Sequence, residues 1–197
     1  MDGHDLAAQH GARRPTARLV AWGRAPKISS NLHEAAKLGA RSQEVDLLVK
    51  TPMRTREIPP LLRSPVDLVV FDGHGRLPPR VGRLPLDPAL IRDEDGRGIV
   101  APAFVLGACG GATEPFIAAL RTCLDSPTAF FGCDGTAEYE QAETVFPPVV
   151  DLLAQLGPTP APSDFCDGLS ALLARLGDTA RGWTTTLLTP ADRNSRI

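Results

Sequence analysis

Several segments of strand length in this chain are apolar at nearly every position, rather than at every second position. The strongest of them, "VDLVVFDGHG" at 66–75, is a run of β-branched and apolar residues closed by two glycines. Comparable runs lie at 17–23, 103–109 and 127–133. A strand that is apolar on both sides must be covered on both sides, which is typical of a parallel sheet held between two layers of helices.

Segments with helical apolar spacing alternate with these strands. The expected helices cover 29–40, 113–124, 139–157 and 164–177. The third is predicted to be interrupted by Pro147 and Pro148, which cannot donate backbone hydrogen bonds. This alternation predicts an α/β fold, a three-layer α/β/α sandwich around a mostly parallel sheet of about six strands.

The remaining segments are shorter or less regular. Two further strands are expected at 44–50 and 182–189, and a short crossover broken by prolines at 55–64. The segment 76–102 is rich in proline, glycine and charged residues. It is therefore predicted to be mostly loop, with one helical turn in "DPALIRD" at 87–93.

Length and composition limit the class of protein. The 197 residues fit one domain over 16–190, with tails at 1–15 and 191–197. A net charge of −2 gives no electrostatic reason to bind nucleic acid or an anionic membrane. The N-terminal residues lack the apolar core of a signal peptide and no stretch has transmembrane length, so we expect a cytoplasmic protein. The preference for arginine over lysine, with abundant Ala, Pro and Gly, is typical of a GC-rich bacterial genome.

The four cysteines do not form a metal-binding pattern. They stand at Cys109, Cys123, Cys133 and Cys166, with no CxxC pair among them. We therefore expect free thiols, and neither a metal nor a cofactor. Cys123 and Cys166 fall in apolar helices and are predicted to be packing residues.

Three predicted strands end in residues that can carry chemistry. These ends are Asp72–Gly75, Gly107–Gly111 and Cys133–Gly135. The carboxyl ends of parallel strands meet at one edge of a sheet, which is where such folds bind their ligands. The sequence thus predicts a site at this edge.

The segment "FVLGACGGATEPF" at 104–116 has three interpretations. As a phosphate-binding loop it lacks the lysine that such loops need, and Glu114 would repel an anion. As a nucleophile, Cys109 would stand just before a helix N-terminus, where backbone N–H groups stabilise a thiolate. As a plain turn, it would simply hold a small buried thiol.

A nucleophilic thiol needs a general base, and His74 is the best-placed histidine. His4 and His10 fall in the expected tail, and His33 falls inside a predicted helix. His74 ends the strongest strand and is flanked by glycines. If the two strands are neighbours, His74 and Cys109 meet at the same edge of the sheet.

The motifs "VVFDGHG" and "FVLGACGG" resemble the His-Gly and Ala-Cys-x-Gly signatures of caspase-like (clan CD) cysteine peptidases, and the downstream segment resembles the bacterial CHAT-type branch. The resemblance implies a cysteine endopeptidase in which Cys109 is the nucleophile and His74 the acid–base. It implies an oxyanion hole formed by the N–H groups of Gly75 and Cys109, and a final antiparallel strand, for which 182–189 is the candidate.

The resemblance also bears on substrate preference. Metacaspase-like relatives carry an aspartate two residues before the nucleophile, which helps to bind a basic P1 side chain, but this chain has Gly107 there. A CHAT-like arrangement makes Asp134, Glu138 and Glu140 the candidate P1-binding carboxylates. The expected partners are a protein or peptide substrate and a regulatory protein. Two other functions stay open: a catalytically silent scaffold of the same fold, and a flavodoxin-like domain that binds a small ligand.

Overall fold

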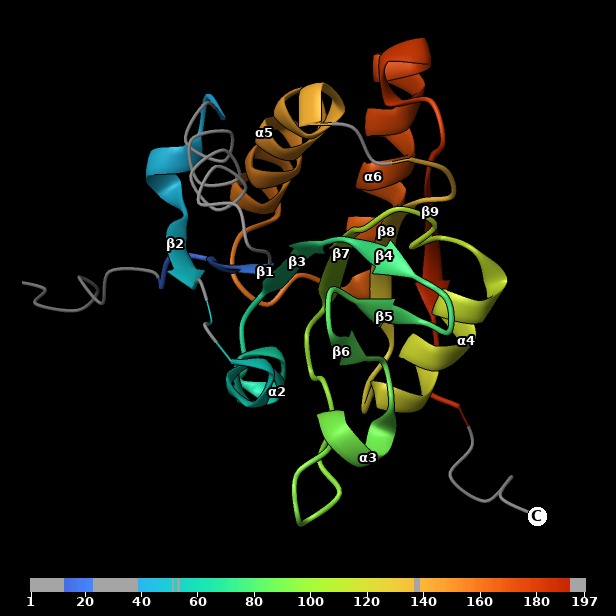
Figure 1. Cartoon of the computed structure of the whole chain (residues 1–197). Helices are drawn as coiled ribbons and strands as arrows, with labels where there is room; N and C mark the ends of the chain where they lie inside the picture. The colour runs from blue at the N-terminus through green and yellow to red at the C-terminus, as the bar shows by residue number, and fades with distance from the viewer. Residues whose placement is uncertain (1–12, 23–38, 51, 53, 137–138, 192–197) are drawn as a thin grey trace, which may run out of the picture.

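A six-stranded sheet runs through the centre of the molecule, in the order β2-β1-β3-β7-β8-β9 (Figure 1). The computed structural model describes residues 13–22, 39–50, 52, 54–136 and 139–191. The strands are β1 (Thr16–Trp22), β2 (Asp46–Lys50), β3 (Leu68–Gly73), β7 (Ala103–Gly107), β8 (Thr128–Cys133) and β9 (Trp183–Leu188). All neighbouring pairs are parallel except β8 and β9, which are antiparallel.

Helices cover both faces of this sheet, so the fold is the three-layer α/β/α sandwich that the sequence predicts (Figure 1). The α-helices are α2 (Ile58–Arg63), α3 (Pro88–Ile91), α4 (Glu114–Cys123), α5 (Tyr139–Leu156) and α6 (Pro162–Leu176), and short 3-10 helices occur at Ser42–Glu44, Thr55–Glu57 and Gly177–Ala180. The core on one face joins the sheet to α5 and α6, and the core on the other joins it to α2, α3 and α4.

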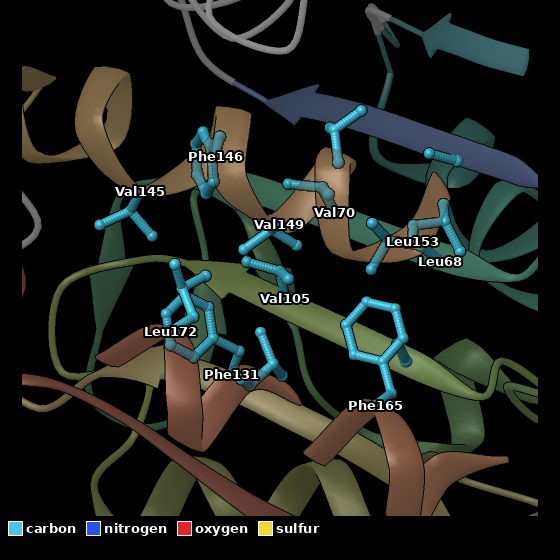
Figure 2. Packing of buried hydrophobic residues seen from close by; sticks show 14 of the residues in the cluster. Leu68, Val70, Val105, Phe131, Val145, Phe146, Val149, Leu153, Phe165 and Leu172 are labelled. Carbon is cyan, nitrogen blue, oxygen red and sulfur yellow. The ribbon is translucent and has the colours of Figure 1, made fainter. Parts of the chain in front are cut away.

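The apolar runs are explained by these two cores. Leu68 and Val70 of β3 pack with α5 and α6, whereas Val69 and Phe71 belong to the core on the opposite face. Figure 2 shows side chains of the first core, in which residues from β3 and β7 meet those of α5 and α6. Because alternate side chains of a strand point to opposite faces, a strand buried on both faces must be apolar throughout.

Several predicted elements are confirmed within two or three residues. The six strands occur, the crossover at 55–64 contains α2, and the turn in 87–93 is α3. The last strand is antiparallel, as the family resemblance implies. The helix expected over 29–40 lies outside the described residues, apart from its last two positions.

Two segments differ from the expectation. The segment 76–102 is mostly turn and loop, as predicted, but it also holds a small antiparallel sheet of β4 (Gly75–Arg76), β5 (Arg80–Val81) and β6 (Leu84–Pro85). The buried side chains of Val81 and Leu84 hold it against the α4 side of the main sheet. Helix α5 also continues through Pro147 and Pro148 without a break. Its apolar residues on both sides of the prolines pack against the sheet, and this packing outweighs the lost hydrogen bonds.

Candidate functional site

The register between β3 and β7 brings the two candidate catalytic residues to the same level. Every pair in this ladder is separated by 35 positions in the sequence, from Leu68 opposite Ala103 to Asp72 opposite Gly107. His74 and Cys109 are separated by the same 35 positions, and each lies two residues beyond the last pair. The two residues therefore follow neighbouring strands, at matching places on the carboxyl edge of the sheet.

The backbones at this edge are in direct contact. A Cβ atom on Gly75 would collide with the carbonyl oxygen of Cys109, and would lie 3.0 Å from both the backbone nitrogen and the carbonyl carbon of Cys109. Only a residue without a side chain allows this approach. The residue after His74 thus packs on the main chain of Cys109.

The small sheet that follows His74 fixes its backbone. The N–H of Gly82 donates to the carbonyl oxygen of His74 at 2.7 Å, and Gly75 pairs with Val81. In an antiparallel ladder, hydrogen-bonded and non-hydrogen-bonded pairs of residues alternate. Because the neighbouring residues His74 and Gly82 are hydrogen-bonded, Gly75 and Val81 form a non-hydrogen-bonded pair, whose N–H and C=O groups point away from the partner strand. The N–H of Gly75 is therefore turned away from β5. The side chain of His74 is exposed.

The backbone N–H groups of the turn after Cys109 are hydrogen-bonded to carbonyl groups of the protein. The N–H of Gly110 donates to the carbonyl of Gly135 at 2.8 Å, and that of Ala112 to the carbonyl of Cys133 at 2.9 Å. The N–H groups of Gly111 and Thr113 bond to carbonyls inside the turn. A loop that cradles phosphate must offer such donors to its ligand. This turn does not have the donor pattern of a phosphate loop, and the Cys109 N–H is not among its bonds.

The four thiols differ in environment. Cys123 and Cys133 are fully buried, and burial raises the pKa of Cys123 to about 11. Burial also raises the pKa of Cys133, with further upward effects from the nearby charges of Asp134 and Cys109. Cys166 is partly buried on α6, 3.6 Å from the hydroxyl of Thr185. Cys109 is partly exposed at the sheet edge.

Of the three carboxylates predicted to bind a basic substrate side chain, one is described in full. Asp134 follows β8, is exposed, and its N–H donates to the carbonyl of Gly182 at 2.9 Å. Glu138 lies outside the described residues. Glu140 lies in the first turn of α5, and its side chain is also outside the described part.

Asp72 was not singled out as a site residue by the sequence, although it stands in one of the three strand ends. It is the first acidic residue after a run of four apolar ones. Its carboxylate accepts a hydrogen bond from the Gly73 N–H, and burial raises its pKa to about 7. The sequence does contain a signal for Asp72, because a charged residue at the end of a strand that is otherwise buried on both faces is a candidate site residue.

Comparison with known proteins adds no relative. No protein-family model matches the chain, and no curated protein sequence matches it significantly. Among the residues that the structure describes, no group of three or more His, Cys, Asp or Glu side chains is placed to hold a metal ion. The described helices include none with the length and apolar character of a membrane span.

Proposed function

We propose that this chain is a caspase-like cysteine endopeptidase that uses Cys109 as its nucleophile and His74 as its general acid–base. The observation that carries the proposal is the shared offset of 35 positions, together with the contact between Gly75 and the Cys109 backbone. Two residues of complementary chemistry follow neighbouring strands at the edge where α/β sheets bind ligands.

The proposed reaction proceeds through a thioester. His74 takes the proton of the Cys109 thiol, the sulfur attacks the peptide carbonyl carbon to form an S–C bond, and the carbonyl π electrons move onto oxygen. The N–H groups of Gly75 and Cys109 stabilise this oxyanion. The tetrahedral intermediate collapses and the C–N bond breaks, while His74 gives its proton to the leaving amine. His74 then takes a proton from a water molecule that attacks the thioester carbon. The C–S bond breaks, the acid is released, and His74 returns the proton to the Cys109 sulfur.

Two observations favour this assignment over the alternatives within the chain. Cys123 and Cys133 are buried and held as neutral thiols, which disfavours them as nucleophiles. The turn after Cys109 spends the N–H groups of residues 110–113 on its own carbonyls and on those of residues 133–135. This weakens the case for a small anionic ligand in this loop. The substrate is a protein or peptide, a regulatory protein partner is in keeping with the family, and a reducing cytoplasm suits a thiol nucleophile.

Covalent labelling tests the proposal. We expect a peptidyl chloromethyl ketone with arginine or lysine at P1 to alkylate Cys109, as located by mass spectrometry of the digested protein. His74→Ala should reduce the labelling rate by at least about 100-fold, because general acid–base groups contribute factors of this size. Cys109→Ala should remain unlabelled, and Cys166→Ser, which removes the other partly buried thiol, should label like the parent protein.

The same experiment identifies the competing functions. If iodoacetamide modifies Cys109 but no peptide electrophile does so faster, the chain is a catalytically silent scaffold. If a small molecule co-purifies with the protein and protects Cys109 from iodoacetamide, the chain is a ligand-binding domain. Equal labelling of the parent protein and His74→Ala would also contradict the peptidase proposal.

A further inference from the structure

Asp72 lies on the face of the main sheet that α5 and α6 cover. Leu68 and Val70, on the same strand, belong to the core on that face, and side chains two positions apart share a face of a strand. Asp72 pairs with Ala21 of β1 on one side and with Gly107 of β7 on the other. Asp72 therefore lies beside the last residue of β7, which precedes Cys109 by two positions, and Asp72 itself precedes His74 by two positions.

The same row of the sheet continues towards β9. Extending the pair Leu106–Gly132 by one residue places Gly107 beside Cys133, which pairs with Trp183. Cys133 and Trp183 belong to the core under α5 and α6. The nearby charge of Cys109 is one of the effects that raise the pKa of Cys133. This places the Cys109 thiol close to the row that contains Asp72.

The carboxyl of Asp72 takes the place that a side chain at position 107 would occupy. A Cβ atom on Gly107 would lie 2.6 Å from Oδ1 of Asp72 and 3.3 Å from Cζ of Phe146. Phe146 packs edge-on against Trp183, with ring centroids 6.0 Å apart, and Figure 2 shows its ring between α5 and the sheet. A carboxyl group and an aromatic surface thus come together beside a residue without a side chain.

This carboxyl lacks a cationic partner within the described part of the chain. The ion pairs formed by the described residues do not include Asp72, whose carboxylate accepts from the Gly73 N–H. Asp67, just before the same strand, shows the opposite situation. It is bound by Arg13 at 2.6 Å and by the N–H groups of Thr16 and Thr159 at 2.7 Å. The hydrogen-bonding capacity of the buried Asp67 is therefore met by the fold, whereas the partly buried Asp72 has no cation in the described structure to stabilise its charge.

The row of Asp72 also holds a polar group without a hydrogen-bond partner. Within the described structure, Nε1 of Trp183 is buried and has no hydrogen-bond partner. A partly buried carboxylate without a cationic partner and a buried indole donor without a hydrogen-bond partner are an unusual combination on one row of a sheet. Aromatic rings beside a carboxylate suit a side chain with an apolar stem and a cationic end.

The distance along the strand matches such a side chain. Gly107 precedes Cys109 by two residues, and a strand rises about 3.3 Å per residue, so the row lies roughly 6.6 Å below the level of the nucleophile. A substrate bound for cleavage has its P1 residue next to the Cys109 sulfur. The four-carbon stem of lysine, or the longer arginine side chain, spans this distance and brings the charge to Asp72.

We infer that Asp72 is the carboxylate that binds the basic P1 side chain of the substrate, in the position that a side chain at residue 107 would otherwise fill. The inference rests on the proposed peptidase function. It assigns to Asp72 the role for which the family resemblance makes Asp134, Glu138 and Glu140 the candidates. Asp72 is a specificity-determining residue here, and it takes no part in bond breaking.

Peptide substrates that differ only at P1 test this assignment. The set carries arginine, lysine or norleucine, the last being an uncharged chain of similar length to the lysine stem. In Asp72→Asn we expect kcat/KM for arginine and lysine to fall about 10- to 100-fold, the range for a lost hydrogen bond to a charged group. The norleucine value should stay nearly unchanged. Asp46→Asn, which neutralises an exposed carboxylate at the amino end of β2, on the opposite edge of the main sheet, is the matched control.

Other outcomes overturn the inference. An equal loss on all three substrates would mean that Asp72 acts through His74 or Cys109 and not on P1. An unchanged preference in Asp72→Asn, or a loss of preference in Asp134→Asn instead, would move the role to another carboxylate. Failure of the peptidase function has a separate signature: Cys109 of the parent protein then reacts with no peptidyl chloromethyl ketone, whatever its P1 residue.

Discussion

Gly75 is the residue on which the proposed site depends most directly for its geometry. Its α-carbon packs against the carbonyl of Cys109, so that any side chain at this position forces the segment after His74 away from the nucleophile. The same residue supplies one of the two proposed oxyanion donors. The physical requirement at position 75 is therefore the absence of a Cβ atom, and not a special backbone conformation.

Gly75→Ala should both destabilise the protein and slow its chemistry. We expect a loss of about 1–3 kcal/mol in the free energy of unfolding, the range for an overpacked site, and a large fall in the rate of Cys109 labelling. Urea denaturation and labelling kinetics measure the two effects. Gly135→Ala is the control, because a Cβ atom there meets nothing within 4 Å. If Gly75→Ala labels as fast as Gly135→Ala, the contact is unimportant for the site.

Asp72 makes the stability of the fold depend on pH. Burial raises the pKa of Asp72 to about 7, above its value of about 4 in an unfolded chain. Between these two values the folded state binds the proton more tightly than the unfolded state does. Stability is therefore lost as pH rises from about 4 to about 7, and the full cost, on the order of a few kcal/mol, applies above pH 7.

Asp72→Asn should remove this cost. The amide oxygen of asparagine can still accept from the Gly73 N–H, but the side chain does not ionise. We expect the stability of the variant relative to the parent protein to rise by a few kcal/mol between pH 3.5 and pH 8, as measured by urea denaturation. A difference that is the same at both pH values would show that Asp72 does not titrate as described. A gain in stability coupled to a loss of P1 preference would mark a residue kept for function.

At the scale of elements, the sequence predicts long and apolar segments well and short ones poorly. The strands β3, β7 and β8 are recognisable because both of their faces are buried, so that the pattern does not depend on register. The strands β4, β5 and β6 have two residues each, which is too short for any periodicity. Prolines and glycines in that segment predict loop, which most of it is, and the burial of Val81 and Leu84 in the core stabilises a small sheet that the pattern does not predict.

Helix α5 shows the complementary limit. Two consecutive prolines predict an interruption, since each removes one hydrogen bond and crowds the preceding turn. The helix remains continuous because Val145, Phe146, Val149 and Val150, on either side of the prolines, are all buried against the sheet. Local propensity is overruled here by tertiary packing, which the sequence alone does not display.

The candidate site was predictable in its chemistry but not in its register. A histidine and a cysteine that each follow an apolar strand can be found by inspection, and so can the 35 positions between them. The sequence does not show that β3 pairs with β7, nor that paired residues of these two strands are also 35 positions apart. This equality is what brings His74 and Cys109 to the same level. The role of Asp72 could not be predicted in the same way. It depends on the missing side chain of Gly107, on the neighbouring strand.

At the scale of the whole molecule, the amino and carboxyl edges of the main sheet differ in how their side chains are bonded. At the amino end of β3, Asp67 is 1% exposed and ties the segment before β1 and the loop after α5 to the sheet. At the carboxyl end, His74, Cys109 and Asp72 gather with few side-chain partners. The strand order also reverses between β1 and β3, and folds of this kind bind ligands at the carboxyl edge of such a reversal.

This separation predicts that global stability and site chemistry respond to different mutations. Asp67→Ala leaves the N–H groups of Thr16 and Thr159 without their acceptor, and an unsatisfied buried donor costs about 1–3 kcal/mol. We expect the free energy of unfolding to fall by about 2–4 kcal/mol, because two such donors lose their acceptor, whereas Arg13 is 59% exposed and its lost ion pair adds little.

The rate of Cys109 labelling, measured at a temperature where Asp67→Ala is still folded, should stay close to that of the parent protein. Gly75→Ala provides the contrast, since it should slow labelling strongly for a smaller loss of stability. The bonds of Asp67 lie at the amino end of β3, one strand length from the edge where His74 and Cys109 stand, and they reach the site only through a sheet that is packed on both faces. If Asp67→Ala slows labelling as much as Gly75→Ala does, the two ends of the sheet are coupled and the site is not an independent unit of the fold.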